Sequence, residues 1–128
     1  MANKTLSIIE SAYRATLEEQ DDTIIWIMHA MKGAGGDFTV LLRANAVNYG
    51  VGAQDAAGVR FGDWTQTQPP SIAKDVQAFV SKGVDVYVVE EDVAERGIER
   101  TDLVPGLKFT SRAGIAKLFA DHDRVWHW

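Results

Sequence analysis

The stretch VDVYVVEED, residues 84–92, decides the fold that this sequence predicts. Its first part, Val84–Val89, is apolar and largely β-branched, and only Asp85 interrupts it. Continuous runs of this kind are typical of strands covered on both faces, as in parallel sheets. Three carboxylates follow at 90–92, and open α/β sheets bind ligands outside the carboxyl ends of their strands. The stretch therefore predicts a buried parallel strand with a candidate site directly after it.

The segments on either side of this strand alternate between strand and helix patterns. This order favours one α/β domain over residues 1–128, a three-layer fold with a mainly parallel sheet of four to five strands. Its strands are predicted at Lys4–Ile9, Phe38–Ala46, Val84–Val89, Leu107–Thr110 and the closing residues 123–128. Its later helices are predicted to begin near Ser71 and Ser111. The last helix is expected to face inward with Ile115, Leu118 and Phe119.

The first helix is predicted from its two ends. Residues Thr16–Glu19, TLEE, form a capping box, and Gly33 suits the left-handed position after the helix. The helix is apolar nearly all round, so we expect it to be buried beneath the sheet and a partner subunit. The alternative is that residues 23–28, TIIWIM, form a strand.

Composition and charge exclude several classes of protein. Thirteen basic and eighteen acidic residues give 13 − 18 = −5, which disfavours binding to nucleic acid or to a membrane surface. The longest apolar stretch, Ile24–Met28, is far shorter than the ~20 residues that span a bilayer. With no apolar leader at the N-terminus, we expect a cytoplasmic protein. The absence of cysteine excludes disulfides, thiolate zinc sites and thiol nucleophiles.

Two groups of polar residues are expected to line one crevice at the carboxyl edge of the sheet. They follow the second and third strands, and the long connection 47–70 is predicted to act as a binding loop or lid, with room for a short helix. Repulsion among the carboxylates is expected to raise one pKa for acid–base work. Otherwise the carboxylates form a solvated corner in which Asp92 caps a short helix ending at Gly97. The candidate ligand-binding residues are Asn45, Asn48, Tyr49, Glu90 and Asp92.

Other chemistry-bearing residues receive structural interpretations. His29 is predicted to pack inside the first helix, and residues 121–123 with His127 match no zinc spacing. The glycines of residues 32–37, KGAGGD, follow a helix and precede a strand, so they indicate a turn rather than a phosphate loop. No catalytic residue, metal site or cofactor is predicted.

Three tryptophans are candidate interface residues. Trp126 and Trp128 are two residues apart, so an extended tail places both on one face. Exposed tryptophans often anchor subunit interfaces, and intramolecular packing on the sheet is the alternative for this pair. Trp26, on the first helix, is the third candidate.

The segment VYVVEEDVAERGI, Val86–Ile98, resembles the DsrE/DsrF/DsrH sulfur-relay family and is most similar to its DsrH/TusB branch. The order of the remaining segments agrees with that branch, apart from a longer first-helix region and an apparent insertion at 50–70. The agreeing segments are KTLSIIES (4–11), FTVLLRANAV (38–47), LKFTS (107–111) and AGIAKLFADHDRVWHW (113–128).

This resemblance implies a small α/β fold that assembles as homotrimers or as hetero-oligomers. Sulfur-carrying members hold a persulfide on a cysteine near the end of the third strand, at a position that aligns with Val89. Valine supplies no nucleophile. The expectation is a non-catalytic subunit that supports or regulates a sulfur relay, as a homo-oligomer (trimer or higher) or with cysteine-bearing DsrE-like paralogues. The alternative is a small-molecule-binding domain or enzyme that uses the crevice.

Overall fold

The computed structural model describes residues 4–13, 22–54 and 58–128. A five-stranded sheet forms the centre, in the order β6-β5-β2-β1-β7, and every pairing in it is parallel. The strands of this sheet are β1 (Thr5–Ile9), β2 (Phe38–Leu42), β5 (Val86–Val89), β6 (Lys108–Thr110) and β7 (Arg124–His127), and the helices are α2 (Thr23–Gly33), α3 (Ile72–Ser81), α4 (Glu90–Glu95) and α5 (Ile115–Ala120), with 3-10 turns η1 (Ala44–Gly50) and η2 (Arg100–Asp102).

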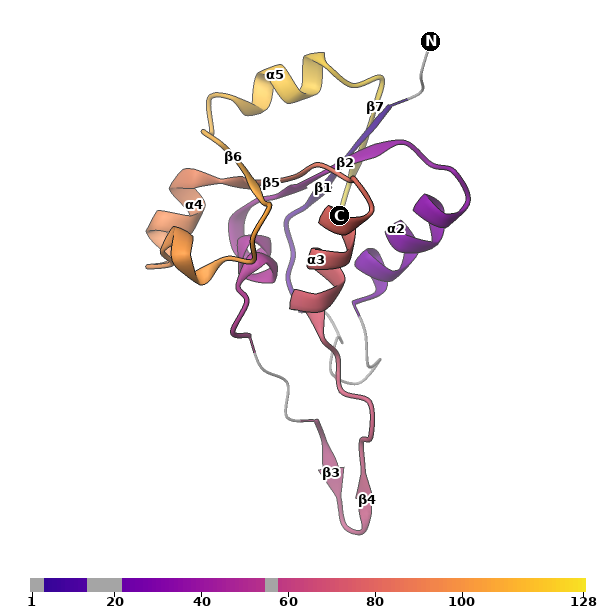
Figure 1. Cartoon of the computed structure of the whole chain (residues 1–128). Coiled ribbons are helices and arrows are strands. Elements are labelled where there is room, and N and C mark those ends of the chain that lie inside the picture. The colour runs from indigo at the N-terminus through magenta and orange to yellow at the C-terminus, as the bar shows by residue number, and fades with distance from the viewer. Residues whose placement is uncertain (1–3, 14–21, 55–57) are drawn as a thin grey trace.

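The sheet has helices on both faces, which gives the predicted three layers (Figure 1). Alternate residues of β1 point to opposite faces: Ile9 joins the apolar cluster beneath α2 and α3, whereas Leu6 and Ile8 join the cluster beneath α5. Every residue of β1 and β2 is buried. The continuous apolar strands therefore lie where the sequence predicts them, between two layers.

The segment TIIWIM forms the first half of α2, so the helix prediction is confirmed and the strand alternative is wrong. The Asp22 side chain caps the helix by accepting a hydrogen bond from the Ile25 N–H at 3.0 Å. The predicted capping box at residues 16–19 lies outside the described residues. The left-handed glycine after the helix is Gly35, with φ +91°, and not Gly33, which still belongs to the helix.

The second strand is shorter than predicted. It ends at Leu42, and the residues expected to continue it to Ala46 form the start of η1. Ala44 has a left-handed backbone, with φ +50°, and its N–H donates to the Asp92 carboxylate at 2.7 Å. That bond takes the N–H away from the ladder, so the strand stops here.

The connection after η1 contains a β-hairpin that the sequence interpretation missed. Strands β3 (Arg60–Phe61) and β4 (Trp64–Thr65) pair antiparallel and belong to no other sheet. Gly62, with φ +58°, opens the two-residue turn, as type II′ turns require. We call residues 58–66 the arm, because they project away from the body of the molecule (Figure 1).

The remaining helices follow the predicted apolar stripes, with local differences. Ser71 occupies the predicted N-cap position of α3 without a capping hydrogen bond. Asp92 lies within α4 instead of capping a later turn. On α5, Ile115 and Leu118 are buried as predicted, but Phe119 is exposed. Among the described residues, every helix is too short or too polar to traverse a lipid bilayer.

Candidate functional site

The carboxyl ends of the parallel strands meet at one edge of the sheet, which we call the carboxyl edge. Glu10 follows β1, Arg43 follows β2, Glu90 follows β5, and His127 ends β7. The chain steps from β1 through β2 and β5 to β6 in one direction, whereas β7 pairs on the other side of β1. The strand order therefore switches at β1 and β7, where open α/β sheets bind ligands.

Asp92 is the most enclosed ionisable group of the third-strand cluster, at 6% exposure. One carboxylate oxygen accepts from the Ala44 N–H, and the other pairs with the Arg112 guanidinium. Burial alone would raise the pKa of Asp92, but the hydrogen bonds from Ala44 and Arg112 and the positive charges of Arg112 and Arg96 outweigh burial and lower it. Asp92 is therefore not the carboxyl group with the raised pKa that the sequence predicts in this cluster, and its carboxylate fastens α4 to the end of β2.

Arg96 brings two of the predicted site residues together. Its Nη2 donates to the Asn45 side-chain oxygen at 2.9 Å, and its Nη1 donates to the Asp92 main-chain carbonyl at 3.1 Å. The Asn48 amide in turn donates to the Asn45 main-chain carbonyl at 2.8 Å. Glu90 points elsewhere and pairs with Arg100 at 3.0 Å. Polar groups at this end of the edge thus bind one another.

Tyr49 is fully buried, at 0% exposure. Its hydroxyl donates a short hydrogen bond to the Asp22 carboxylate and accepts from the Tyr13 N–H. Desolvation and the negative charge of Asp22 together raise the pKa of Tyr13. These contacts tie η1 to the start of α2, so Tyr49 serves the core at this end of the sheet.

A row of ionisable side chains that the sequence interpretation did not group crosses β7, β1 and β2. His127 Nε2 lies 3.1 Å from one Glu10 oxygen, and Arg43 Nε lies 3.5 Å from the other. All three side chains are at least one-third exposed. The rule that selected Asn45 and Glu90 would have found Glu10, which directly follows the predicted first strand. It would have missed Arg43, which lies inside the predicted second strand, Phe38–Ala46.

The other histidines have structural contacts. His122 meets the Leu118 carbonyl and the Thr39 hydroxyl. His29 stacks on Phe79 with ring centroids 3.9 Å apart, as its predicted packing role requires. Among the residues that the structure describes, no three His, Cys, Asp or Glu side chains are placed to hold a metal ion.

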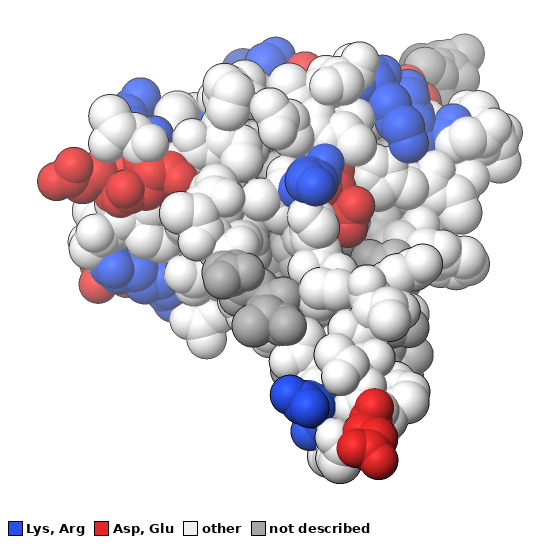
Figure 2. All heavy atoms as spheres, turned by 60° about the horizontal axis from the view of Figure 1, so that its bottom comes forward, with Lys and Arg blue, Asp and Glu red and all other residues white. Residues whose placement is uncertain are grey.

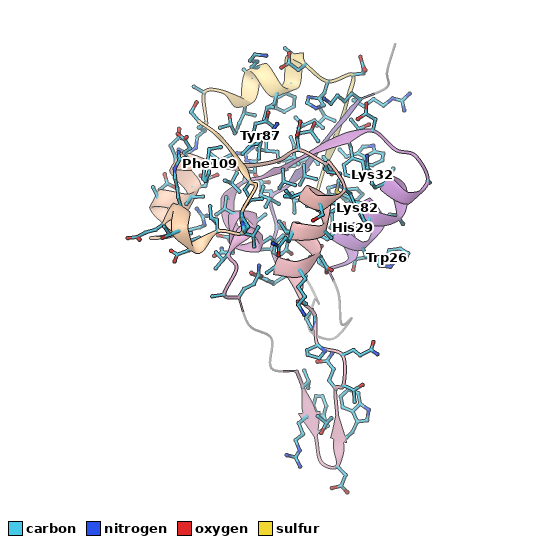
Figure 3. All side chains as sticks on the ribbon, in the orientation of Figure 1. Trp26, His29, Lys32, Lys82, Tyr87 and Phe109 are labelled. Atoms are coloured by element: carbon cyan, nitrogen blue, oxygen red, sulfur yellow. The ribbon has the colours of Figure 1, made fainter. Side chains whose placement is uncertain are left out.

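The three candidate interface tryptophans occupy two places. Trp126 and Trp128 share a face as predicted, with ring centroids 6.3 Å apart, and the Trp128 indole N–H donates to the Ser7 hydroxyl at 3.1 Å. Both are half-buried. Trp26 is 57% exposed on α2 and points outward beside a cleft between α2 and α3 (Figure 3).

Val89 ends β5 at 0% exposure. It belongs to the apolar cluster beneath α5, with Ile115 and Leu118. The position that the family resemblance aligns with a sulfur-carrying cysteine therefore lies inside the core of this chain.

Comparison with known proteins finds likeness in structure at low sequence identity. No family model and no curated protein matches the chain. The YchN protein from E. coli is similar over 100% of both chains, with a TM-score of 0.74 and 15% identity. Two proteins of unknown function are also similar: MTH1491 from Methanobacterium thermoautotrophicum (TM-score 0.66, 11% identity, 98% of each chain) and BT1422 from Bacteroides thetaiotaomicron (0.67, 10%, 98% of this chain and 95% of that one). At these identities the likeness shows the fold alone, and that fold is DsrE-like.

Proposed function

We propose that this chain is a non-catalytic, DsrE-like oligomeric subunit that supports or regulates a sulfur relay whose cysteine lies on another protein. The DsrE-like fold supports the proposal, and the resemblance of residues 86–98 to the DsrE/DsrF/DsrH family motivates it. A homo-oligomer of three or more copies, or a hetero-oligomer with cysteine-bearing paralogues in the cytoplasm, is the corresponding assembly.

The observation that carries this proposal is the burial of Val89. Sulfur relay passes sulfane sulfur from a persulfide to an incoming thiolate, so the carrier atom must be a reachable sulfur. This chain has no cysteine, and Val89 is enclosed by the cluster beneath α5. The chain therefore acts by binding a carrier and not by being one.

The polar groups of the carboxyl edge favour the same role. The Asp92 carboxylate is held ionised by Ala44 and Arg112, and Asn45 is engaged by Arg96. A general base needs a pKa near the working pH, whereas the pKa of Asp92 is lowered. These contacts give a rigid edge rather than acid–base chemistry.

The test is a transfer assay with a cysteine-bearing DsrE-like paralogue from the same source. Each protein is incubated with a labelled persulfide donor, alone and mixed, and the label on each is measured. We expect the paralogue alone to take up label, and this chain to bind the paralogue and change its transfer rate. Label on this chain in the absence of the paralogue would overturn the proposal, as would a mixture showing neither binding nor a change in rate.

A small-molecule site at the carboxyl edge is the second candidate function. Two observations favour it: the left-handed φ of Ala44, a type of strain that clusters at functional sites, and the row of Glu10, Arg43 and His127 at the switch in strand order. A thermal-shift screen of small polar anions and cations tests it, because a ligand at 100 times its Kd stabilises by about 2.7 kcal/mol. The Arg43→Ala variant, which lacks one charge of the row, should lose any such shift.

A further inference from the structure

The arm exposes the two most solvent-accessible large apolar side chains among the described residues. Phe61 is 69% and Trp64 58% exposed, and their ring centroids are 6.2 Å apart because the two residues pair directly across the hairpin. Arg60 and Asp63 are also exposed, and the Arg60 Nε–H donates to the Gly62 carbonyl at the turn. Figure 2 shows basic and acidic side chains beside each other at the tip.

The arm is built to reach a partner. Isolated two-stranded hairpins are marginally stable in water, and each strand of this one has only two residues. Its two sides are also joined below the tip: Gln66, at 6% exposure, accepts from the Val59 N–H through its side chain and donates its own N–H to the Val59 carbonyl. Exposed apolar surface of the kind found at the tip marks interaction sites.

A cleft on the same chain has the matching properties. It lies between α2 and α3, measures about 240 Å³, and is lined by Trp26, His29, Asp75, Ala78 and Lys82. Sites for small-molecule ligands are usually about 300–1,000 Å³, so this cleft suits inserted side chains better than a whole ligand. Asp75 and Ala78 of α3 and Lys82, its C-cap residue, are spaced three and four residues apart, with the small alanine between the two charges.

We propose that the arm of one chain docks in the α2–α3 cleft of a second copy of this chain. The proposed function includes contact between copies of this chain. This inference rests on that function and names the two surfaces that meet. Phe61 and Trp64 cover Trp26 and Ala78, which removes the most exposed apolar groups of both surfaces from water.

Charge complementarity sets the orientation of the docked arm. Arg60 lies opposite Asp75, and Asp63 lies opposite Lys82. The Lys82 ammonium has three donors, of which one goes to His29 Nδ1 at 2.9 Å, so donors remain for a carboxylate.

The cleft that receives the arm belongs to another copy, because the arm points away from the body that carries its own cleft (Figures 1 and 3). Such a contact joins two different surfaces, and repetition of it closes a ring or a reciprocal pair.

Disulfide trapping tests the contact directly, because the chain has no cysteine of its own. Purified Asp63→Cys is mixed with purified Lys82→Cys under mild oxidation, and the disulfide-linked dimer is quantified on a non-reducing gel. We expect this pair to cross-link at least tenfold faster than the control pair of Asp63→Cys with Lys108→Cys, because Lys108 is also an exposed lysine but lies on β6, outside the cleft. Equal rates for the two pairs would overturn the proposal.

A charge exchange provides a second readout that does not depend on cysteine. Asp63→Lys alone and Lys82→Glu alone should each shift the light-scattering mass towards the monomer, and the double variant should restore it. Single variants that keep the wild-type mass, or a double variant that stays dissociated, would contradict the contact.

The outcomes separate this inference from the proposed function. A wild-type oligomer without the selective cross-link removes the arm contact and leaves the proposed function standing. A selective cross-link without any effect on sulfur transfer by a paralogue removes the sulfur-relay function and supports the arm contact. A monomer that neither cross-links nor binds a paralogue removes both.

Discussion

The carboxyl edge around Asp92 and the β3–β4 arm differ in where their side chains find partners. At the edge, carboxylates, amides and guanidinium groups bind one another, and Asp92 is 6% exposed. On the arm, Phe61 and Trp64 are 69% and 58% exposed. The carboxylates that look reactive in the sequence thus hold the fold together, whereas the tip of the arm, within the connection predicted as a binding loop, keeps its aromatic side chains exposed. Polar residues in a sequence therefore indicate a binding surface only where the folded chain does not already use them for contacts with one another.

The largest loss of stability is expected when the Asp92 carboxylate is removed from the carboxyl edge. Asp92→Ala should lower the free energy of unfolding by about 2–3 kcal/mol, because it leaves the Ala44 N–H and the Arg112 guanidinium without their acceptor. Alanine is a good helix former, so the loss does not come from α4 itself. Urea denaturation measures it. Glu95→Ala is the matched control: Glu95 pairs with the same Arg112 but is exposed, and its removal should cost less than about 1 kcal/mol.

Acid should weaken the edge next. The pKa of Asp92 is lowered in the folded chain, so its carboxylate stabilises the fold above the unfolded value of about 3.9. This stabilisation begins to be lost as the pH falls below about 4 and is lost further as the pH passes through the lower pKa of the folded chain. Unfolding measured between pH 6 and 3 should therefore show a shallower pH dependence in Asp92→Asn than in the wild type. Parallel curves would show that Asp92 does not govern acid sensitivity.

A cysteine introduced at position 89, which the family resemblance aligns with the sulfur-carrying cysteine, should be unreactive in the folded chain. We expect Val89→Cys to cost about 1 kcal/mol for the lost methyl group and to leave the thiol unreactive towards an aromatic disulfide reagent in the folded state, because the side chain at this position is enclosed. Full reactivity on denaturation is the internal control. A thiol that reacts readily in the native chain would mean that the end of β5 opens, and would weaken the case for a non-catalytic subunit.

A smaller gain in stability is expected at Ala44. Its φ of +50° costs an L-residue about 1–2 kcal/mol, and glycine removes that cost at the expense of about 0.5–1 kcal/mol of backbone entropy. Ala44→Gly should therefore raise the free energy of unfolding by up to about 1 kcal/mol. Ala46→Gly, at a neighbouring position where no left-handed φ occurs, should lower it. Destabilisation by both variants would argue against strain at the end of β2.

The smallest effect on folding is expected on the arm. Phe61→Ser combined with Trp64→Ser should change the unfolding free energy by less than about 0.5 kcal/mol at concentrations where the chain is monomeric, because both side chains are mostly exposed. A loss of 2 kcal/mol would show that the arm packs on its own body, and the contrast with the edge would fail.

The framework of the fold could be predicted because its signals are local. The β-branched run 84–89 predicted a parallel strand covered on both faces, and β5 lies between β2 and β6 in the sheet. The spacing of Ile72, Val76, Phe79 and Val80 indicates an inward stripe on α3, of which the first three residues are buried and Val80 is half-buried. Each conclusion needed only neighbouring residues.

What the sequence did not predict depends on distant contacts or on short signals. The second strand stops early because Asp92, far along the chain, accepts the Ala44 N–H, and no local pattern encodes that bond. The same contact explains why a cluster of carboxylates did not raise the pKa of Asp92. The hairpin had a local signal, Gly62-Asp63 between Phe61 and Trp64, but strands of two residues are too short to show alternation.

The two outer strands have a consequence for how this protein behaves when it is crowded. β6 and β7 have three and four residues, and each opens with an exposed cation, Lys108 and Arg124. Short outer strands with charged residues discourage sheets of different molecules from pairing edge to edge. Concentrated solutions should therefore resist growth into amyloid-like fibres.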